Sequence, residues 1–187
     1  DNMFNSNPLQ SNRTRNWFHV DWLLYNLKWT ASFSKDTKFS LQYFGLKAQR
    51  DALGFRSNRV DQIDPGGVRD LIQGKFQNNG IETRLLHHYK LGMQESVFLI
   101  GSKYYKAENS SQQGPGLAGK DAFFEFQLED FPYYNNQSKY TYPNQNIALF
   151  SENIFYLSDK TSITPGVRLE YINTQSDGFY RQINIDA

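Results

Sequence analysis

The stretch LLYNLKWTASF, residues 23–33, alternates between apolar and polar side chains and decides the fold class. From Leu23 to Phe33 the odd positions are apolar or aromatic, whereas the even positions after Leu24 are polar. A period of two with one apolar face is typical of a β-strand rather than of a helix. The alternation resumes over residues 37–43, so we predict an antiparallel hairpin over about residues 17–49 with a turn at 34–36.

One register makes both faces of this hairpin consistent, as a specified hairpin requires. If Phe33 pairs with Thr37, the apolar face carries the pairs Ala31–Phe39, Trp29–Leu41 and Leu27–Tyr43. The polar face then carries the pairs Thr30–Ser40 and Lys28–Gln42.

Two further hairpins follow the same pattern. The first, over about residues 81–106, combines strands at 81–91 and 97–106 with a turn at 92–96. The second, over about residues 147–173, combines strands at 147–157 and 161–171 with a turn at 158–160. Pro165 lacks a donor for the ladder and predicts a bulge or a local edge.

The connections between the hairpins are long and polar. Residues 52–79 and 107–139 are rich in Gly, Asn, Asp and Gln, and we expect them to be long extracellular loops. Short turns that alternate with long loops are typical of bacterial outer-membrane barrels. Ten steps of about 3.3 Å at a tilt near 40° rise roughly 25 Å, the height of the apolar band of such a barrel. We therefore expect an all-β, antiparallel, up-and-down transmembrane β-barrel segment of about six strands.

Composition excludes several other classes. The chain has 187 residues, a formal net charge of +1 and no cysteine. The charge balance argues against a nucleic-acid binder, and the lack of cysteine excludes disulfides and cysteine-ligated metals. No apolar run is long enough for a transmembrane helix. Because the chain starts at Asp1 without a leader and ends in a strand-like stretch at 182–187, we expect a partial barrel cut from a longer protein.

Three segments resemble the barrel of TonB-dependent outer-membrane receptors, with the ferric-dicitrate type as the most similar subgroup. They are NWFHVD at 16–21, GIETRLL at 80–86, and ALFSEN at 148–153 followed by ITPGVRLEY at 163–171. The resemblance implies a plugged, 22-stranded barrel in the outer membrane of a Gram-negative bacterium that imports a ferric chelate such as iron-citrate. It also implies contact with outer-membrane lipid, and with TonB through a segment that this chain does not contain. The plug domain has no counterpart in these residues.

No catalytic constellation emerges, and we expect neither an enzyme nor a bound cofactor. His87 and His88 alternate faces on a strand and His19 stands apart, so a metal site is not expected. The haem receptors of the same superfamily carry an FRAP motif, whereas this sequence has FRSN at 55–58. This difference argues against a haem receptor.

The first long loop and its approach carry five cations that are candidates for ligand capture. Arginine pairs bidentately with carboxylates such as those of a citrate chelate. The candidate ligand-binding residues are Arg50, Arg56, Arg59, Arg69 and Lys75. Each could instead be solvated or balance a nearby aspartate. The second loop is acidic, and its aromatic residues between 123 and 134 could cover a ligand or pack against other loops.

The polar strand faces predict a charged lumen that contacts the plug. Its expected members are Lys28, Lys38, Arg84, Glu152, Arg168 and Glu170. If Leu157 pairs with Thr161, Glu152 lies opposite Gly166 and diagonal to Arg168, and we expect a Glu152–Arg168 contact that anchors the wall or the plug.

Two alternatives stay open at this point. One is a non-energised porin, and the other is a soluble all-β domain that binds carbohydrate through exposed aromatic residues. The isolated piece would also expose two unpaired strand edges, which recruit either the remaining chain or another molecule.

Overall fold

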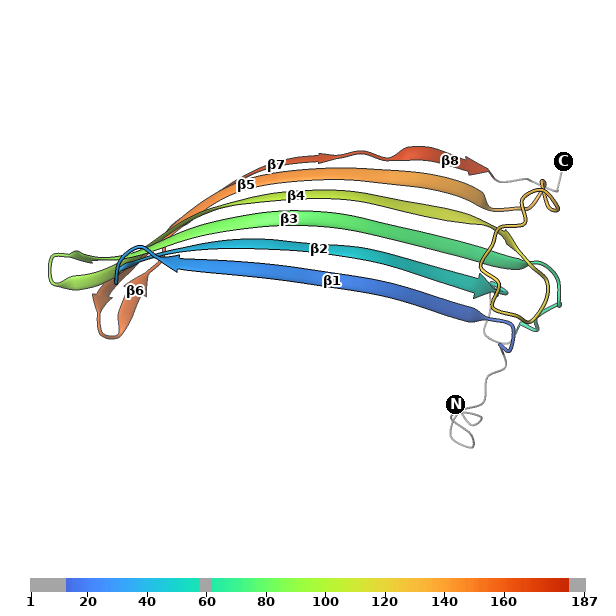
Figure 1. Ribbon diagram of the computed structural model, residues 1–187, viewed down its shortest axis with the longest axis horizontal. Helices are drawn as coiled ribbons and strands as arrows, with labels where there is room; N and C mark the ends of the chain where they lie inside the picture. The colour runs from blue at the N-terminus through green and yellow to red at the C-terminus, as the bar shows by residue number, and fades with distance from the viewer. Residues whose placement is uncertain (1–12, 58–61, 182–187) are drawn as a thin grey trace, which may run out of the picture.

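The computed structural model describes residues 13–57 and 62–181, and this part of the chain forms one long antiparallel sheet (Figure 1). The strands are β1 (Trp17–Ser32), β2 (Thr37–Gly54), β3 (Arg69–Leu91), β4 (Gln94–Gly116), β5 (Gln137–Ser158), β6 (Thr161–Ile163), β7 (Gly166–Thr174) and β8 (Asp177–Arg181). Strands β1 to β5 pair in chain order, and β6, β7 and β8 all pair with β5 as pieces of one sixth strand. The predicted all-β, up-and-down architecture is confirmed.

The first hairpin has the predicted register. Leu27 faces Tyr43, Trp29 faces Leu41 and Ala31 faces Phe39. The Phe33 amide donates to the Thr37 carbonyl at 3.0 Å, so residues 34–36 form the turn. The second turn is shorter than predicted and consists of Gly92 and Met93, with Gly92 in the left-handed region at φ 65°. Glycine adopts this conformation without steric cost, so the ladder continues from Gln94 onward.

The third hairpin differs from the prediction at its turn. Thr161 pairs with Ser158 rather than with Leu157, and a register shift between Tyr156 and Ser158 absorbs the extra residue. The predicted pairing of Glu152 with Gly166 is therefore retained. Pro165 was expected to cause a bulge or a local edge, and the strand is interrupted there, between Ile163 and Gly166. The Pro165 carbonyl still accepts a hydrogen bond from the Asn153 amide at 3.0 Å.

The loops are shorter than the ranges 52–79 and 107–139 that the sequence suggested. Strands β2 to β5 extend far past the alternating segments, and the connections shrink to residues 55–68 and 117–136. The polar residues that resembled loop sequence belong to strand extensions with polar groups on both faces. The alternation seen near the turns does not continue into these extensions with the same apolar face, although the ladder of backbone hydrogen bonds continues.

The sheet is a single layer with almost no core of its own. Its buried hydrophobic residues are Ala48, Leu53, Leu71, Ala107 and Ala148. The chain exposes 13621 Å², against roughly 9300 Å² expected for a compact monomer of this mass. Among the described strands, β1 and the strand formed by β6–β8 are each paired on one side only. These are the two free edges that the sequence led us to expect. Such a layer needs other surfaces on both of its faces.

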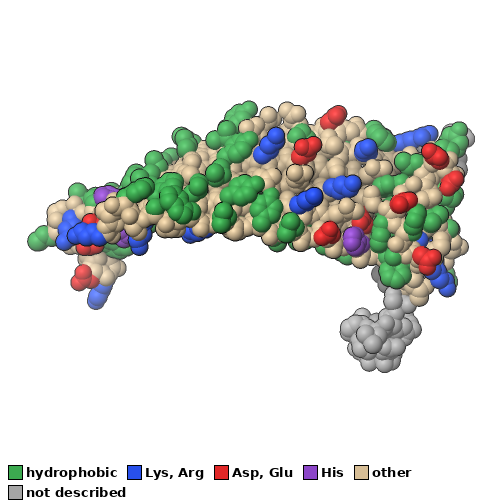
Figure 2. Space-filling model, in the orientation of Figure 1, with side chains coloured by type: hydrophobic (Ala, Val, Ile, Leu, Met, Phe, Trp, Pro, Cys, Tyr) green, Lys and Arg blue, Asp and Glu red, His purple; other side chains and the backbone are tan. Residues whose placement is uncertain are grey.

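The two faces of the sheet differ sharply toward the end that carries the short turns, which we call the turn end. On one face, a row running across all six strands contains Leu27, Tyr43, Ile81, Tyr104, Ile147 and Tyr171. Between this tyrosine row and the turns, the described strand residues of this face include no Asp, Glu, Lys or Arg. We call this side the band face and its uncharged zone the band; Figure 2 shows it as hydrophobic patches over the turn half of the sheet.

The opposite side, the reverse face, is charged over the same length. Its charged residues there are Lys28, Lys38, Glu82, Arg84, Lys90, Glu95, Lys103, Glu152, Arg168 and Glu170. The band from Ile81 to Leu91 measures about 33 Å along the strand, or about 25 Å in height at a tilt near 40°.

Candidate functional site

Two arginines hold the loops together at the other end of the sheet, the loop end. Arg15 pairs with Asp64 at 2.5 Å and also donates to the carbonyls of Gly67, at 3.1 Å, and Ala118. The hydrogen bonds from Arg15 lower the pKa of Asp64. Arg69 is fully buried and donates to the carbonyls of Leu117 at 2.7 Å, Arg15 at 3.0 Å and Asp121 at 2.8 Å. These guanidinium groups therefore join the segment before β1 to both loops.

A second junction on the reverse face centres on Asp70. This carboxylate accepts hydrogen bonds from Gln113 at 2.8 Å and Tyr134 at 3.2 Å, and it pairs with Arg56 at 3.5 Å. Asp70 is 8% exposed, and burial raises its pKa. Burial, together with the charge of Asp70, also raises the pKa of the Tyr134 hydroxyl. Asp70 thus links β3 and β4 to both loops.

Residues 121–128 of the second loop lie against the band face rather than over the reverse face. Gln73 donates to the Phe124 carbonyl at 2.9 Å, and the Phe124 ring lies 5.6 Å from the His19 ring. Phe126 packs where Gly114 leaves room on β4. Together with the buried Leu53 and Leu71, these contacts form a small core at the loop end. Phe124 and Phe126 therefore pack on strands, whereas Tyr133 is 77% exposed.

The turn half of the reverse face contains a hollow of about 430 Å³ that brings together three of the six predicted lumen residues, Arg84, Glu152 and Arg168. Glu82, Arg84, Lys103, Phe150, Glu152 and Arg168 line it. The Phe150 ring lies over Gly101 and is flanked by the guanidinium groups of Arg84, at 5.8 Å, and Arg168, at 5.5 Å. Lys28 lies in the same row as Glu82 and faces Gln42, outside the lining of this hollow.

The expected ion pair between Glu152 and Arg168 is absent from the described part of the chain. Arg168 pairs instead with Glu170, with Nε donating to Oε1 at 2.7 Å, and Arg84 pairs with Glu82 at 2.6 Å. In both cases the partner lies two residues away on the same strand. These neighbours are about 6.6 Å apart, slightly closer than the diagonal cross-strand position of Glu152.

Four of the five predicted ligand-binding cations lie in the described part of the chain, and these four do not converge on one site. Arg50 is exposed on the reverse face between Val20 and Gly74. Arg56 lies at the start of the first loop, beside Asp70. Lys75 is exposed on the band face, and Arg59 lies outside the described residues. Arg69 is buried with three carbonyl partners, so it is not available to a ligand in this arrangement.

The sequence reasoning missed an inversion of polarity near the tyrosine row. Toward the loop end, the reverse face carries apolar and aromatic groups, including Phe18, Trp22, Leu24, Phe76 and Tyr142. Its only charged residues among the described strand positions there are Arg50 and the buried Asp70. The band face becomes charged in the same region, as Figure 2 shows. The signal was present in β1, where the even positions from Phe18 to Leu24 are apolar.

Comparison with known proteins identifies the architecture. The sequence matches no family model and no curated protein. The structure is similar to that of the ferric citrate transporter FecA in its unliganded form, with a TM-score of 0.67, 15% identity and 97% of this chain covered. It is also similar to BauA, the ferric preacinetobactin receptor of Acinetobacter baumannii, with a TM-score of 0.61, 10% identity and 89% of this chain covered. The chain has the fold of a receptor-barrel segment. It spans about a quarter of each neighbour, 26% and 27% of their lengths.

The chain shows neither a metal centre nor a membrane-crossing helix within the residues that the structure describes. No group of three or more His, Asp or Glu side chains is arranged to hold a metal ion there. No helix in that part of the chain is long and apolar enough to cross a bilayer.

Proposed function

We propose that this chain is part of the wall of a TonB-dependent outer-membrane transporter that captures and imports a ferric chelate such as iron-citrate. The observation that carries this proposal is the distribution of charge over the two faces of the sheet. A band about 25 Å high without charged side chains, backed by a charged reverse face, suits a barrel strand with lipid outside and a polar lumen inside. The location would be the outer membrane of a Gram-negative bacterium.

In this proposal the reverse face is the lumen wall, and its two halves have different roles. The charged hollow around Phe150 would face the plug, with Arg84, Glu152, Arg168 and Glu170 as contacts and Lys28 in a neighbouring position. The apolar half at the loop end would form a vestibule open to the outside. The plug, and the segment that contacts TonB, would come from parts of the protein that this chain does not contain.

Within the vestibule, Arg50 and Arg56 are the cations of the predicted set that remain available to an anionic chelate. Both are exposed, and the Arg56 side chain keeps 63% of its surface accessible beside Asp70. An arginine with few other charged side chains around it attracts a carboxylate more strongly than an arginine that is surrounded by charges of both signs. The aromatic neighbours of Arg50 would contact the organic part of the chelate.

Uptake of radioactive iron tests this proposal in a Gram-negative strain that lacks its own receptor for the chelate and expresses the full-length protein. We expect energy-dependent uptake of ferric citrate, and at least about tenfold weaker uptake in the double variant Arg50→Ala/Arg56→Ala, since each charged hydrogen bond contributes about 1.5–3 kcal/mol. Lys75→Ala, on the band face, is the matched control and should transport normally.

Two results would contradict parts of the proposal. Uptake that persists when the proton gradient is collapsed would indicate a non-energised pore. Uptake of ferric citrate that is equal in the double variant and the wild type would exclude these arginines as its contacts.

A further inference from the structure

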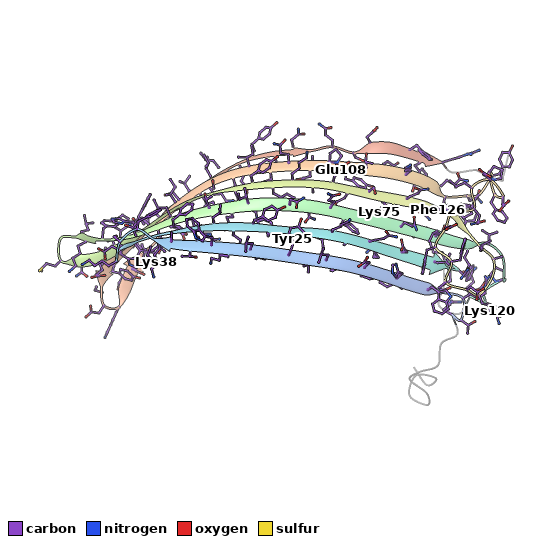
Figure 3. The ribbon with its side chains drawn as sticks, in the orientation of Figure 1. Tyr25, Lys38, Lys75, Glu108, Lys120 and Phe126 are labelled. Atoms are coloured by element: carbon purple, nitrogen blue, oxygen red, sulfur yellow. The ribbon has the colours of Figure 1, made fainter. Side chains whose placement is uncertain are left out.

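Asp70 is a buried carboxylate that pairs with an exposed arginine of the vestibule. It lies near the start of β3, at the loop end of the sheet, where Figure 3 shows Lys120 and Phe126 of the second loop. The Asp70 side chain is 8% exposed, whereas the Arg56 side chain keeps 63% of its surface accessible. Arg56 Nη1 approaches Asp70 Oδ2 at 3.5 Å, which is long for a hydrogen bond between charged groups. Asp70 therefore depends on Arg56 for its countercharge, while most of the Arg56 guanidinium group is open to another anion.

The other contacts of Asp70 are neutral donors. Gln113 Nε2 donates to Oδ2 at 2.8 Å, and the Tyr134 hydroxyl donates to Oδ1 at 3.2 Å. A protonated carboxyl group still accepts hydrogen bonds. Protonation of Asp70 would therefore keep both neutral donors in place and would remove only the need for Arg56.

No further charge faces this carboxyl group from the neighbouring elements of the described chain. Across the two ladders, Asp70 faces Gly54 of β2 and Pro115 of β4. Arg56 from the first loop and Tyr134 from the second loop are the charged or titratable groups that contact it there. Burial raises the pKa of Asp70, and Arg56 acts in the opposite direction together with the neutral donors. The protonation of Asp70 thus depends on whether Arg56 stays beside it.

A hollow of about 170 Å³ lies beside this ion pair. It is lined by Arg56, Asp70 and uncharged groups, among them Trp17, Phe55 and Ile72. Because most of these groups are apolar, charges in the hollow are screened less than they are in bulk water. A carboxylate that reached Arg56 from this hollow would therefore be repelled by ionised Asp70.

An anionic chelate at Arg56 acts on Asp70 in two ways. It competes for the guanidinium group that favours the ionised carboxylate, and it brings a second negative charge close to that carboxylate. Both effects raise the pKa of Asp70 further, so a proton from the solvent binds there. When the chelate leaves, Arg56 returns to Asp70 and the proton is released.

We propose that capture of an anionic ferric chelate by Arg56 is coupled to the uptake of one proton by Asp70, so that acid strengthens chelate binding. The coupling is reciprocal, because a chelate that favours protonation is itself favoured by protonation. For one proton, the affinity rises by at most about tenfold for each unit that the pH falls. The proposal rests on the function proposed above, since it assumes that Arg56 contacts the chelate.

The first test measures the binding of ferric citrate to the full-length protein in detergent. Isothermal titration calorimetry in two buffers with different ionisation enthalpies gives the number of protons taken up. We expect greater uptake by the wild type than by Asp70→Asn in the pH range where Asp70 titrates. Protons taken up by citrate itself cancel, because both proteins are compared with the same chelate at the same pH.

The affinity of Asp70→Asn separates this coupling from a merely structural role. Above the pH at which Asp70 titrates, the variant should bind ferric citrate about fivefold more tightly than the wild type, because no carboxylate competes for Arg56. Below that pH the two affinities should be equal. Loss of a purely structural carboxylate would weaken binding instead.

The matched control is Asp51→Asn, which removes a buried carboxylate from the band face. Asp51 is 1% exposed and pairs with His19 at 2.9 Å, away from the vestibule. This variant should bind ferric citrate with the affinity and the proton uptake of the wild type. Heat-modifiable migration on gels checks that each variant forms a barrel. If Asp70→Asn does not assemble, Arg56→Gln takes its place, and its remaining chelate binding should take up fewer protons than that of the wild type.

The second test needs no chelate. Arg56→Gln removes the cation from Asp70 and so imitates its capture. Infrared difference spectra follow the protonated carboxyl group of Asp70 with pH, because each protein is compared with the same protein carrying Asp70→Asn. We expect Asp70 to titrate at a higher pH in Arg56→Gln than in the wild type.

Three results would overturn the proposal. They are equal proton uptake by the wild type and Asp70→Asn, no gain of affinity in Asp70→Asn above the pH at which Asp70 titrates, and a titration of Asp70 that Arg56→Gln does not move. Any of these, found together with chelate binding that Arg56→Gln weakens, would leave the function proposed above intact. Binding that Arg56→Gln does not weaken would instead contradict the role of Arg56 in that function.

Discussion

A single lysine substituted into the middle of the band tests whether the band face contacts lipid, because lipid contact makes a buried charge lower the stability of the fold. Ile100 on β4 lies in the band between Leu85 and Ser151, four residues from Tyr104. That separation is about 13 Å along the strand and about 10 Å in height, near the middle of a band about 25 Å high. A lysine at the bilayer midplane of a barrel destabilises the folded state by about 2–4 kcal/mol, so Ile100→Lys should lower the ratio of folded to unfolded protein roughly 30- to 900-fold.

The preceding residue is the control. Leu99 points to the reverse face, opposite Glu152, and lines the charged hollow. Leu99→Lys therefore adds the same group to the same strand in a polar setting beside a carboxylate, and we expect a change within about 1 kcal/mol.

Guanidinium titration of the full-length protein in phospholipid vesicles, followed by heat-modifiable migration, compares the two variants. An Ile100→Lys protein that is no less stable than the Leu99→Lys protein would refute the assignment of the band face to lipid. It would then favour a sheet with water on both faces.

Three further predictions concern the loop end and the hollow. Arg69→Met leaves the carbonyls of Leu117, Arg15 and Asp121 without their donor, so it should lower the free energy of local unfolding of loop 117–136 by at least about 3 kcal/mol. Limited proteolysis of this loop should therefore be faster in Arg69→Met and unchanged in the control Arg50→Met. Because burial raises the pKa of Asp70, its ionised form is the destabilised one at neutral pH. As the pH falls through that raised pKa toward 3.8, the wild type should gain stability relative to Asp70→Asn in the same proteolysis assay, and a gain on raising the pH would contradict this sign. Gly101→Val adds side-chain atoms where the Phe150 ring lies, so it should destabilise the barrel by about 1–3 kcal/mol in guanidinium titration, whereas Ala107→Val, also buried but away from that ring, tests whether any added bulk on β4 has the same effect.

The sequence predicted the turn half of the fold more accurately than the loop half. Alternation from Leu23 to Phe33 set the register of the first hairpin, because one slip would have moved every apolar side chain to the charged face. Pro165 marked the strand break, and Glu152 was placed correctly opposite Gly166. For Pro165 the missing donor of the residue itself decided the result, whereas the position of Glu152 came out correctly because the register shift between Tyr156 and Ser158 compensated for the mispredicted turn pair.

The loop half was harder to predict because its constraints are not local. Residues such as Gln77, Asn78 and Asn79 have the composition of a loop, and only pairing with β2 and β4 makes them a strand. Arg69 resembled a ligand contact, yet its environment consists of carbonyls about fifty residues away in sequence. The positions of Lys75 and Arg50 on opposite faces depend on continuing the register through this half.

The change of polarity along each strand explains why aromatic rings lie over glycines near the tyrosine row. At Gly45, Gly80 and Gly101 a β-carbon would collide with the rings of Tyr25, Phe44 and Phe150, respectively. Each ring packs over a glycine of the neighbouring strand and fills the space that a side chain would otherwise occupy there. Tyr25 is on the band face, where its hydroxyl and that of Tyr43 both donate to Asn79, while Phe44 and Phe150 are on the reverse face. Gly45 and Gly80 lie beneath rings next to the row where the polarity changes, and larger residues there should disturb both faces of the wall together, whereas Gly101 lies beneath Phe150 within the turn half.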